Sequence, residues 1–337
     1  MPAILEFVGV YDQKILKPKT FIRDMYFGKH EKHEQQKFEI EYRKGGQLVA
    51  PFVSEMIPGT EMIKRGYESK YYATPKVAPK RTFTGHELFL QKTAGETIYG
   101  GMSPDERKAK MIAESFEEFE EQIARREEAM CIETLFKGEV LVKGEGVEDK
   151  ITYGTVEEIS AAVTWDQANA DITGDIEATI TKIGETTGQR VEFIVMDPVA
   201  AKLFVNNEKI QKLLDNRNYD VGKIAPKDLP SGAIYLGTLA PYGTLVYSYQ
   251  VQHQVLSEDG KSFTVKKLIP EGRVLFAPTN NILHYGAAVD VSQGIIVAER
   301  VPFEDIDSKA NTVEIRIESR PLPVPFDIDA IKILKVK

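Results

Sequence analysis

The layout of this chain follows from residues 103–131, which read SPDERKAKMIAESFEEFEEQIARREEAMC. The start has the features of a helix N-terminus: Ser103 can cap the first turn, Pro104 suits the first helical position, and Glu106 completes a capping box. No glycine or proline follows before Gly138. We therefore predict one helix over residues 104–131, which at 1.5 Å per residue is about 40 Å long.

The two sides of this helix differ in polarity. Apolar residues recur at helical spacing on one side, at Ile112, Phe116, Phe119, Ile123 and Met130. The opposite side is rich in charge and carries Glu114, Glu117, Glu118, Glu120, Glu121, Arg125, Arg126, Glu127 and Glu128. The pattern predicts that one side packs on a core and that the other lies in solvent.

The residues at the start of the chain predict an extended arm. Residues 1–37 carry scattered apolar anchors without a regular period, and they end in a charged run. Such a segment cannot bury its anchors by itself. We expect it to become ordered only by lying across another surface.

Residues 38–92 predict a long two-stranded excursion. Apolar and charged residues alternate at its start, with the apolar positions at Phe38, Ile40 and Tyr42. Further β-like stretches cover residues 67–74 and 80–90. Because a lone hairpin is marginally stable in water, neighbouring surface must hold this one.

The residues after the long helix predict a second hairpin and a second helix. The hairpin spans 136–154, around the glycine-rich turn Lys143-Gly144-Glu145-Gly146. The helix is amphipathic, begins near Ile172 and ends at Gly188.

The rest of the chain predicts a compact mixed region followed by terminal strands. The run 191–196 reads as a short buried strand, and Asp197-Pro198 then caps and starts another helix. Residues 233–288 are β-rich, and strand alternation returns at 312–318 and 331–336. The fold class expected is α+β.

Composition and charge limit the classes of protein to be considered. The 337 residues allow two or three domains, and 42% hydrophobic with 28% charged residues is typical of a soluble globular protein. The formal net charge of −8 lacks the basic surplus with which nucleic-acid binders neutralise phosphates. If the protein encloses DNA, we expect it to do so as a container.

The single cysteine and the hydropathy pattern indicate where the protein is made. Cys131 has no second cysteine to pair with, so an intrachain disulfide is excluded and a packing role is favoured. We find no secretion signal at the start and no run of 18 apolar residues. These observations predict a soluble protein made in the cytoplasm.

Histidines and paired acids give no recognised site. His30 and His33 are three residues apart, not four as in a zinc helix motif, so a solvated charged patch is favoured over metal binding. The other histidines, His86, His253 and His284, are isolated in the sequence and are expected to be structural. The pairs Asp305/Asp307 and Asp327/Asp329 lack the remaining ligands of a calcium loop.

Motifs of catalysis and nucleotide binding are missing from the sequence. There is no nucleophile elbow, no phosphate-binding loop and no dinucleotide fingerprint. The prediction is that the protein is not an enzyme and has no catalytic residues, no cofactor and no metal site.

Several local sequences resemble one known family. They are Phe136-Lys137-Gly138-Glu139-Val140, Ile151-Thr152-Tyr153-Gly154, Trp165, Phe193-Ile194-Val195-Met196-Asp197-Pro198-Val199, Asn206-Asn207-Glu208-Lys209-Ile210 and Glu318-Ser319-Arg320-Pro321-Leu322-Pro323. In this order they resemble the lambda-type major capsid proteins of tailed phages, the phage capsid protein E family. The order of elements is also similar to that of the Hong Kong 97 capsid fold.

The resemblance implies a division of the chain into the parts of that fold. They are an N-terminal arm (1–37), an extended loop (38–92), a peripheral domain (93–169, with the spine helix 104–131 and the hairpin 136–154), an axial domain (170–300) and return strands of the peripheral domain (301–337).

The resemblance also implies a function and partners. Copies of the chain would form hexamers and pentamers of an icosahedral shell that encloses double-stranded DNA without sequence-specific binding. Scaffold, portal and decoration proteins are further expected partners, and a membrane is not. The protein would be assembled in the host cytoplasm and found in the virion.

Three alternatives remain open at this point. Some proteins of this fold cross-link subunits through a lysine–asparagine bond, and Lys64, Lys70 and Lys76 lie in the predicted loop, but no motif selects a pair. An encapsulin-type nanocompartment would share the fold and store an enzyme. A soluble β-rich enzyme with an unrecognised site is the third.

Overall fold

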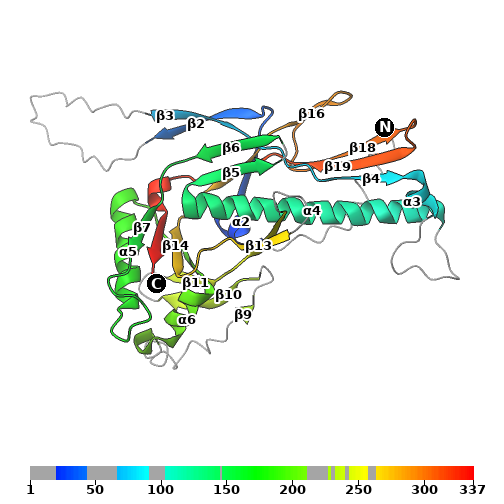
Figure 1. The fold of residues 1–337 in the computed structure, drawn as a ribbon. Coiled ribbons are helices and arrows are strands. Elements are labelled where there is room, and N and C mark those ends of the chain that lie inside the picture. Colours follow the sequence, from blue (N-terminus) through cyan, green and yellow to red (C-terminus); the bar gives the residue numbers. More distant parts are fainter. Residues whose placement is uncertain are drawn as a thin grey trace, which may run out of the picture.

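The computed structural model describes residues 20–43, 67–90, 103–144, 146–210, 227–228, 232–239, 243–256 and 263–337. Its longest element is helix α4 (Pro104–Lys137), which runs along the molecule (Figure 1). The predicted capping box is confirmed: the Glu106 N–H donates to Ser103 Oγ, and the Ser103 N–H donates to Glu106 Oε2 at 2.8 Å. The helix extends six residues beyond the predicted end, because it stops only at Gly138, which takes a left-handed φ of 68°.

The apolar side of α4 contacts two separate cores. Near its N-terminal end, Phe116 and Phe119 pack with Ile315 and Ile317. Near its C-terminal end, Leu135 and its neighbours enter the main core of the molecule. The helix therefore connects two packed regions that are built from different parts of the chain.

A seven-stranded mixed sheet lies at the C-terminal end of α4. Its strand order is β7-β21-β14-β8-β11-β10-β9. The bounds of these strands are β7 (Glu157–Ser160), β8 (Phe193–Met196), β9 (Lys227–Asp228), β10 (Ile234–Leu239), β11 (Thr244–Ser248), β14 (Arg273–Ala277) and β21 (Lys332–Lys335). β8 is central, and Ile194, Val195 and Met196 are fully buried in it.

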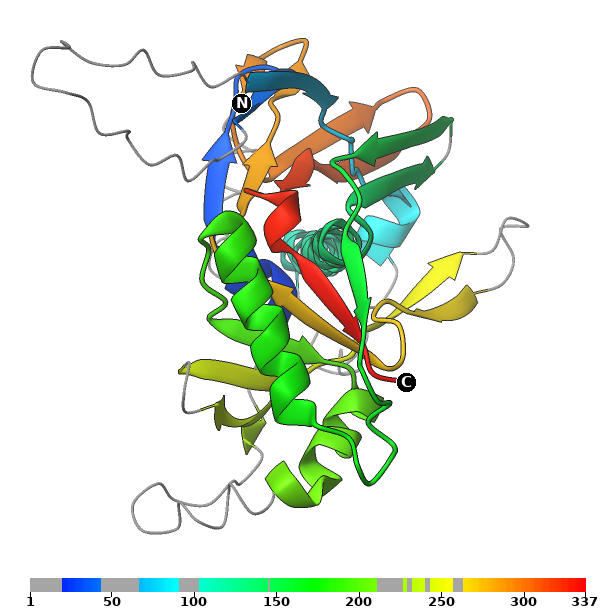
Figure 2. The same cartoon turned by 90° about the vertical axis from the view of Figure 1, so that its left-hand side faces the viewer.

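Side chains alternate between the two faces of this sheet, and each face is covered. Ile194 and Met196 point to the side of helices α5 (Ile172–Thr187) and α6 (Pro198–Asn206). Val195 points to the opposite side, where α2 (Phe21–Tyr26) and the end of α4 pack. Figure 2 looks almost along α4 and shows α5 crossing the sheet.

Two local predictions in this region are confirmed. α5 ends at Gly188, which has a left-handed φ of 70°. The Asp197 side chain caps α6 by accepting from the N–H groups of Val199 and Ala200, and it also accepts from the Gly272 N–H at 3.0 Å. One aspartate thus fixes both a helix start and the turn before β14.

The remaining strands form small sheets around α4. A three-stranded sheet, β18-β19-β4, covers the N-terminal half of the helix, and another, β1-β15-β20, lies near its C-terminal half. The pairs β2–β3, β5–β6, β12–β13 and β16–β17 are hairpins. The bounds are β1 (Lys29–Lys32), β2 (Lys37–Arg43), β3 (Tyr67–Ala73), β4 (Lys80–Thr84), β5 (Glu139–Gly144), β6 (Val147–Thr152), β12 (Gln252–Leu256), β13 (Phe263–Lys267), β15 (Ile282–Tyr285), β16 (Ala288–Asp290), β17 (Gly294–Ile296), β18 (Val301–Asp307), β19 (Thr312–Glu318) and β20 (Pro321–Val324), with the short helices α3 (Gly85–Leu90) and η1 (Ile328–Ala330).

The start of the chain differs from the expected arm. Within the predicted arm 1–37, residues 1–19 lie outside the described residues. The next residues form α2, and Phe21, Ile22, Tyr26 and Phe27 are buried in the chain's own main core. The expectation that this segment needs another molecule to bury its anchors is therefore wrong for residues 20–27. α2 has only six residues, fewer than two helical turns, so its apolar residues do not show a helical period in the sequence.

The predicted excursion is also shorter than expected. β2 and β3 pair with each other, but β4 pairs with β19. Residues 85–90, expected to be β-like, form the helix α3. β4 is not part of the β2–β3 pair, because Phe83 and Leu88 bury their side chains with the N-terminal half of α4.

The last strand lies with the large sheet. β21 pairs with β14 and β7, whereas β19 packs near α4 with β18 and β4. The two terminal strands thus belong to different sheets. The division of the chain into five parts stays a prediction. Among the described residues, no helix is both long and apolar enough to cross a membrane.

Candidate association site: the projecting hairpin and its base

The β2–β3 hairpin projects beyond the C-terminal end of α4 (Figure 1). Its strands pair in antiparallel register from Lys37 with Ala73 to Arg43 with Tyr67. Its tip, residues 44–66, lies outside the described residues. Any function of this hairpin therefore has to be argued from the strands and from the place where they meet the body.

One face of the hairpin is held by the body. Tyr72 is buried against Tyr153, with ring centroids 5.4 Å apart, and the Lys70 ammonium donates to the Tyr153 carbonyl oxygen at 3.3 Å. On the other face, Tyr71 is 75% exposed. The hairpin thus offers a second face to solvent, as an element that contacts another molecule would.

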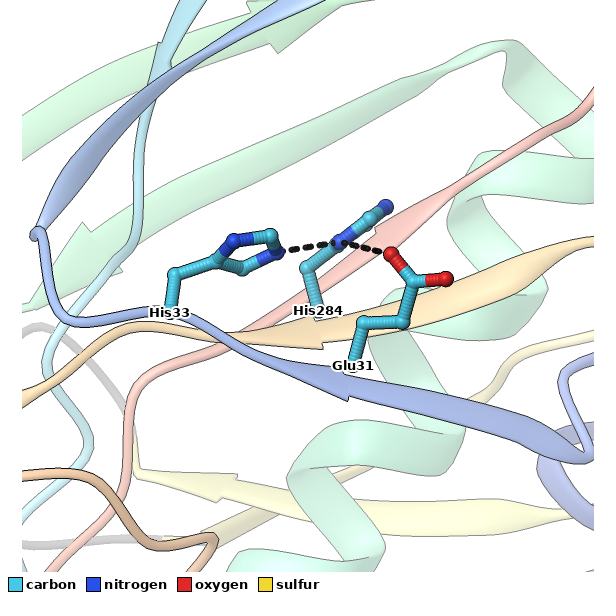
Figure 3. Close-up of side chains that lie close together, drawn as sticks. All are labelled: Glu31, His33 and His284. Atoms are coloured by element: carbon cyan, nitrogen blue, oxygen red, sulfur yellow. Dashed lines mark hydrogen bonds and ion pairs between the residues drawn. The ribbon is translucent and has the colours of Figure 1, made fainter.

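The base of the hairpin continues into a cluster of three polar side chains. β1 pairs in parallel with β15, which places Glu31 opposite His284. The His33 N–H donates to the Tyr285 carbonyl oxygen at 2.8 Å, which brings its ring beside that of His284. Figure 3 shows the three side chains converging: His33 Nε2 is 2.7 Å from His284 Nδ1, and Glu31 Oε2 is 3.8 Å from the same nitrogen.

The first strand of the hairpin covers this cluster. The Phe38 ring stacks on His33 with centroids 4.6 Å apart and lies 5.1 Å from the His284 ring. Burial, together with the neighbouring His33, lowers the pKa of His284 to about 4, so its imidazole is neutral near pH 7. A hydrogen bond from Lys29 lowers the pKa of Glu31, which is therefore ionised.

The sequence did not indicate this cluster. His33 was expected in a solvated patch and His284 to be isolated, yet the two rings are in contact across 251 residues of sequence. His30 points elsewhere, with its Nδ1 3.4 Å from Glu299 Oε2. Only the parallel pairing of β1 with β15 brings the three groups together, and no local spacing reports a pairing of that range.

A second polar cluster fastens α2 to the long helix. Glu128 accepts hydrogen bonds from the Ile22 N–H at 2.9 Å, the Arg23 N–H at 2.8 Å and the Tyr249 hydroxyl at 2.8 Å. Burial raises the pKa of Glu128, and the two backbone donors act against that rise. The carboxylate occupies the first turn of α2, where free N–H groups need an acceptor.

Glu127 forms the other half of this cluster. It accepts from Arg300 at 2.8 Å, from Arg23 at 2.9 Å and from the Tyr285 hydroxyl at 3.0 Å. Glu127 and Glu128 are 0% and 2% exposed, so their expected place on the solvated side of the helix is wrong. α2 and the segment before β18 cover this part of α4 and bring the two arginines that balance the buried charge.

A third feature is an exposed apolar patch on the β16–β17 hairpin. Val289 is 60% exposed, Ile295 63%, and Val291, at the turn, is fully exposed. Exposed apolar patches on a protein surface often mark sites at which proteins contact other molecules.

The other residues considered from the sequence have local roles. Asp305 pairs with Arg316 at 2.5 Å, and the Asp327 side chain caps η1. Cys131 is fully buried in the main core, as expected for a packing role.

Of the lysines considered for cross-linking, Lys64 lies outside the described residues. Lys76 pairs with Glu318 at 2.8 Å, and the side chain of His253 is likewise outside the described part.

Comparison with known proteins gives one consistent answer. The family model of phage major capsid protein E matches residues 10–336. The major capsid protein of Escherichia phage lambda is 24% identical over 340 residues, covering 96% of each chain.

Two solved structures have a similar fold. A putative capsid protein of a prophage of Escherichia coli CFT073 superposes with a TM-score of 0.70 at 16% identity, covering 98% of both chains. The mature capsid subunit of bacteriophage PhiM1 superposes with a TM-score of 0.53 at 10% identity, covering 94% of this chain and 86% of that one. The expected Hong Kong 97-like capsid fold is thereby confirmed.

Proposed function

Because the chain belongs to the phage major capsid protein E family and is a phage major capsid protein, we propose that its copies form hexamers and pentamers of an icosahedral shell around double-stranded DNA. The family match supports this function over an encapsulin-type compartment and over a soluble enzyme. No catalytic role is proposed for any residue.

The projecting β2–β3 hairpin is the observation that carries the proposal. Only one face of its strands packs on the body, through Tyr72 and its neighbours, while Tyr71 on the other face is exposed. A two-stranded hairpin has little stability in water and gains it by burying area on a neighbour. In a closed ring, each copy both gives and receives such a contact.

The exposed patch on β16–β17 offers a second surface for the same purpose. Val289, Val291 and Ile295 belong to a different hairpin from Tyr71, and we propose that they form a second contact surface of the subunit. Contacts of two kinds allow rings to form and then to join into a shell.

The negative net charge of the chain supports a shell that encloses DNA without binding its phosphates tightly. A formal net charge of −8 disfavours tight contact with phosphates. We propose that the protein is assembled in the host cytoplasm and resides in the virion. Scaffold, portal and decoration proteins are the partners proposed for it besides further copies of itself.

Negative-stain electron microscopy of the purified full-length protein tests this function. We expect rings or closed shells, and particles from cells producing the whole phage should hold nuclease-resistant DNA. A protein that stays monomeric at every concentration, or particles filled with an enzyme and free of DNA, would contradict the proposal.

A further inference from the structure

The cluster at the base of the hairpin has a chemistry that shell contacts do not require. We propose that Glu31, His33 and His284 bind a divalent transition-metal ion, with Zn²⁺ the best fit. One ligand atom from each residue lies within 4.8 Å of the other two. The ion would join the segment that precedes the projecting hairpin to β15 in the body of the protein.

The donor atoms suit zinc. Two imidazole nitrogens and one carboxylate oxygen are a ligand set that zinc accepts, whereas calcium and magnesium prefer oxygen alone. Glu31 and His33 are partly exposed, so a water molecule can reach the fourth position of a tetrahedral ion.

The distances require only small movements. Two nitrogens bound to a tetrahedral zinc at about 2.0–2.1 Å are about 3.3 Å apart. The nitrogens of His33 and His284 are 2.7 Å apart and share one proton in a hydrogen bond. The ion replaces that proton, which moves to the outer nitrogen of the same ring. The two nitrogens then move apart by roughly 0.6 Å, and the rings, which now meet end-on, tilt so that both nitrogens point at the ion.

The ligands are held in place by their surroundings. The paired strands set Glu31 opposite His284, the His33 N–H is bonded to the Tyr285 carbonyl, and the Phe38 ring packs on both histidines. Ligands that are already held close together lose little freedom on binding. A frame made of strand pairing and a stacked ring is what a metal site needs around it.

One neighbour opposes a cation. Lys29 Nζ lies 2.6 Å from Glu31 Oε1, so its charge competes with an ion for that carboxylate. The Lys29 side chain is 66% exposed and can swing into solvent. Replacing it with glutamine should therefore strengthen metal binding, the opposite of the effect of losing a ligand.

Metal titration of the full-length protein tests the site without reference to assembly. After treatment with a chelator, calorimetry with Zn²⁺ should show one ion per subunit, and Co²⁺ should give the strong visible absorption of a tetrahedral site. His33→Gln should weaken Zn²⁺ binding roughly 10-fold or more and abolish the Co²⁺ signal. Lys29→Gln should bind Zn²⁺ more tightly.

His30→Gln is the matched control, because His30 lies one residue away and points to Glu299. It should leave both signals unchanged. His284→Gln tests the buried ligand, with circular dichroism to verify its fold. The absence of binding at micromolar Zn²⁺, or an equal loss of Zn²⁺ affinity in His30→Gln and His33→Gln, would overturn the proposed site. The two histidine rings would then have a packing role only.

Discussion

Arg300 and Glu127 form a two-pronged ion pair in which Nη1 lies 2.8 Å from Oε1 and Nη2 lies 2.8 Å from Oε2. The guanidinium also donates from Nε to Glu120 at 2.8 Å and from Nη1 to the Ser319 hydroxyl at 3.0 Å. Arg300 thus joins the segment between β17 and β18 to two positions on α4 that are about two turns apart.

Arg300→Ala should be strongly destabilising. It leaves the fully buried Glu127 without its main partner, and removing one member of a buried pair costs about 3–5 kcal/mol. Arg125→Ala is the control, since Arg125 pairs with Glu121 on the exposed side of the same helix, where such pairs contribute about 0.5 kcal/mol. Urea unfolding of both variants should separate them clearly, and equal losses would argue against the buried network.

Glu128→Ala should release the start of the chain. The N–H groups of Ile22 and Arg23 and the Tyr249 hydroxyl lose their acceptor, at about 1–3 kcal/mol for each buried group left unpaired. Hydrogen exchange over residues 20–27 should rise more than exchange in β8. Glu114→Ala, on the exposed side of the helix, should change neither, and unchanged protection in Glu128→Ala would refute the anchoring role.

Gly138→Ala should destabilise the protein more than Gly146→Ala. Both glycines have left-handed φ angles, 68° and 72°, which cost an ordinary residue about 1–2 kcal/mol. At Gly138, however, a Cβ would also run into the Gly154 carbonyl oxygen, whereas at Gly146 nothing lies within 4 Å. The difference in melting temperature between the two variants isolates this clash, and similar melting temperatures would show that the backbone there yields freely.

Val291→Asp and Ile295→Asp together should impair assembly and leave the subunit folded. Both side chains are exposed, so the charge costs little in the monomer, but it must be desolvated when another copy covers the patch. Val291→Thr preserves the shape and should assemble. Sedimentation velocity and circular dichroism measure the two properties, and normal shells from the aspartate variant would remove β16–β17 from the contact surfaces.

Acid should weaken the attachment of β1 through Glu299. A hydrogen bond from His30, supported by Lys32, lowers the pKa of Glu299 to about 2. A depressed carboxyl pKa stabilises the fold above its ordinary value near 4.5, and the contribution is lost as the pH falls from there towards 2. Glu299→Gln should therefore be less stable than the parent at pH 7, with the gap closing near pH 2. Urea midpoints across this range measure it, and a constant gap would contradict the assignment.

Local signals in the sequence were reliable wherever neighbouring residues determine the structure. Ser103 and Glu106 mark the start of α4, Gly188 the end of α5, and Asp197 the start of α6. In each case the group that satisfies the backbone lies within a few residues. Such contacts are visible in a single sequence.

Contacts between distant residues were not predictable in the same way. Glu128 lies in a run that looks solvated, and its partner Ile22 is 106 positions away. The contact of His33 with His284 depends on which strand pairs with β1. In the same way, the pairing of β4 with β19 depends on the burial of Phe83 beside α4. These choices are made by packing across the whole molecule.

The place of β21 in the large sheet affects the timing of folding during synthesis. Because β21 lies between β14 and β7, the sheet has a gap until residues 332–335 have emerged from the ribosome. Without them, β14 has a strand partner only on the β8 side, and β7 has none. The core on the α5 side of the sheet, which includes Val274 and Leu334, therefore closes only when this strand has been added.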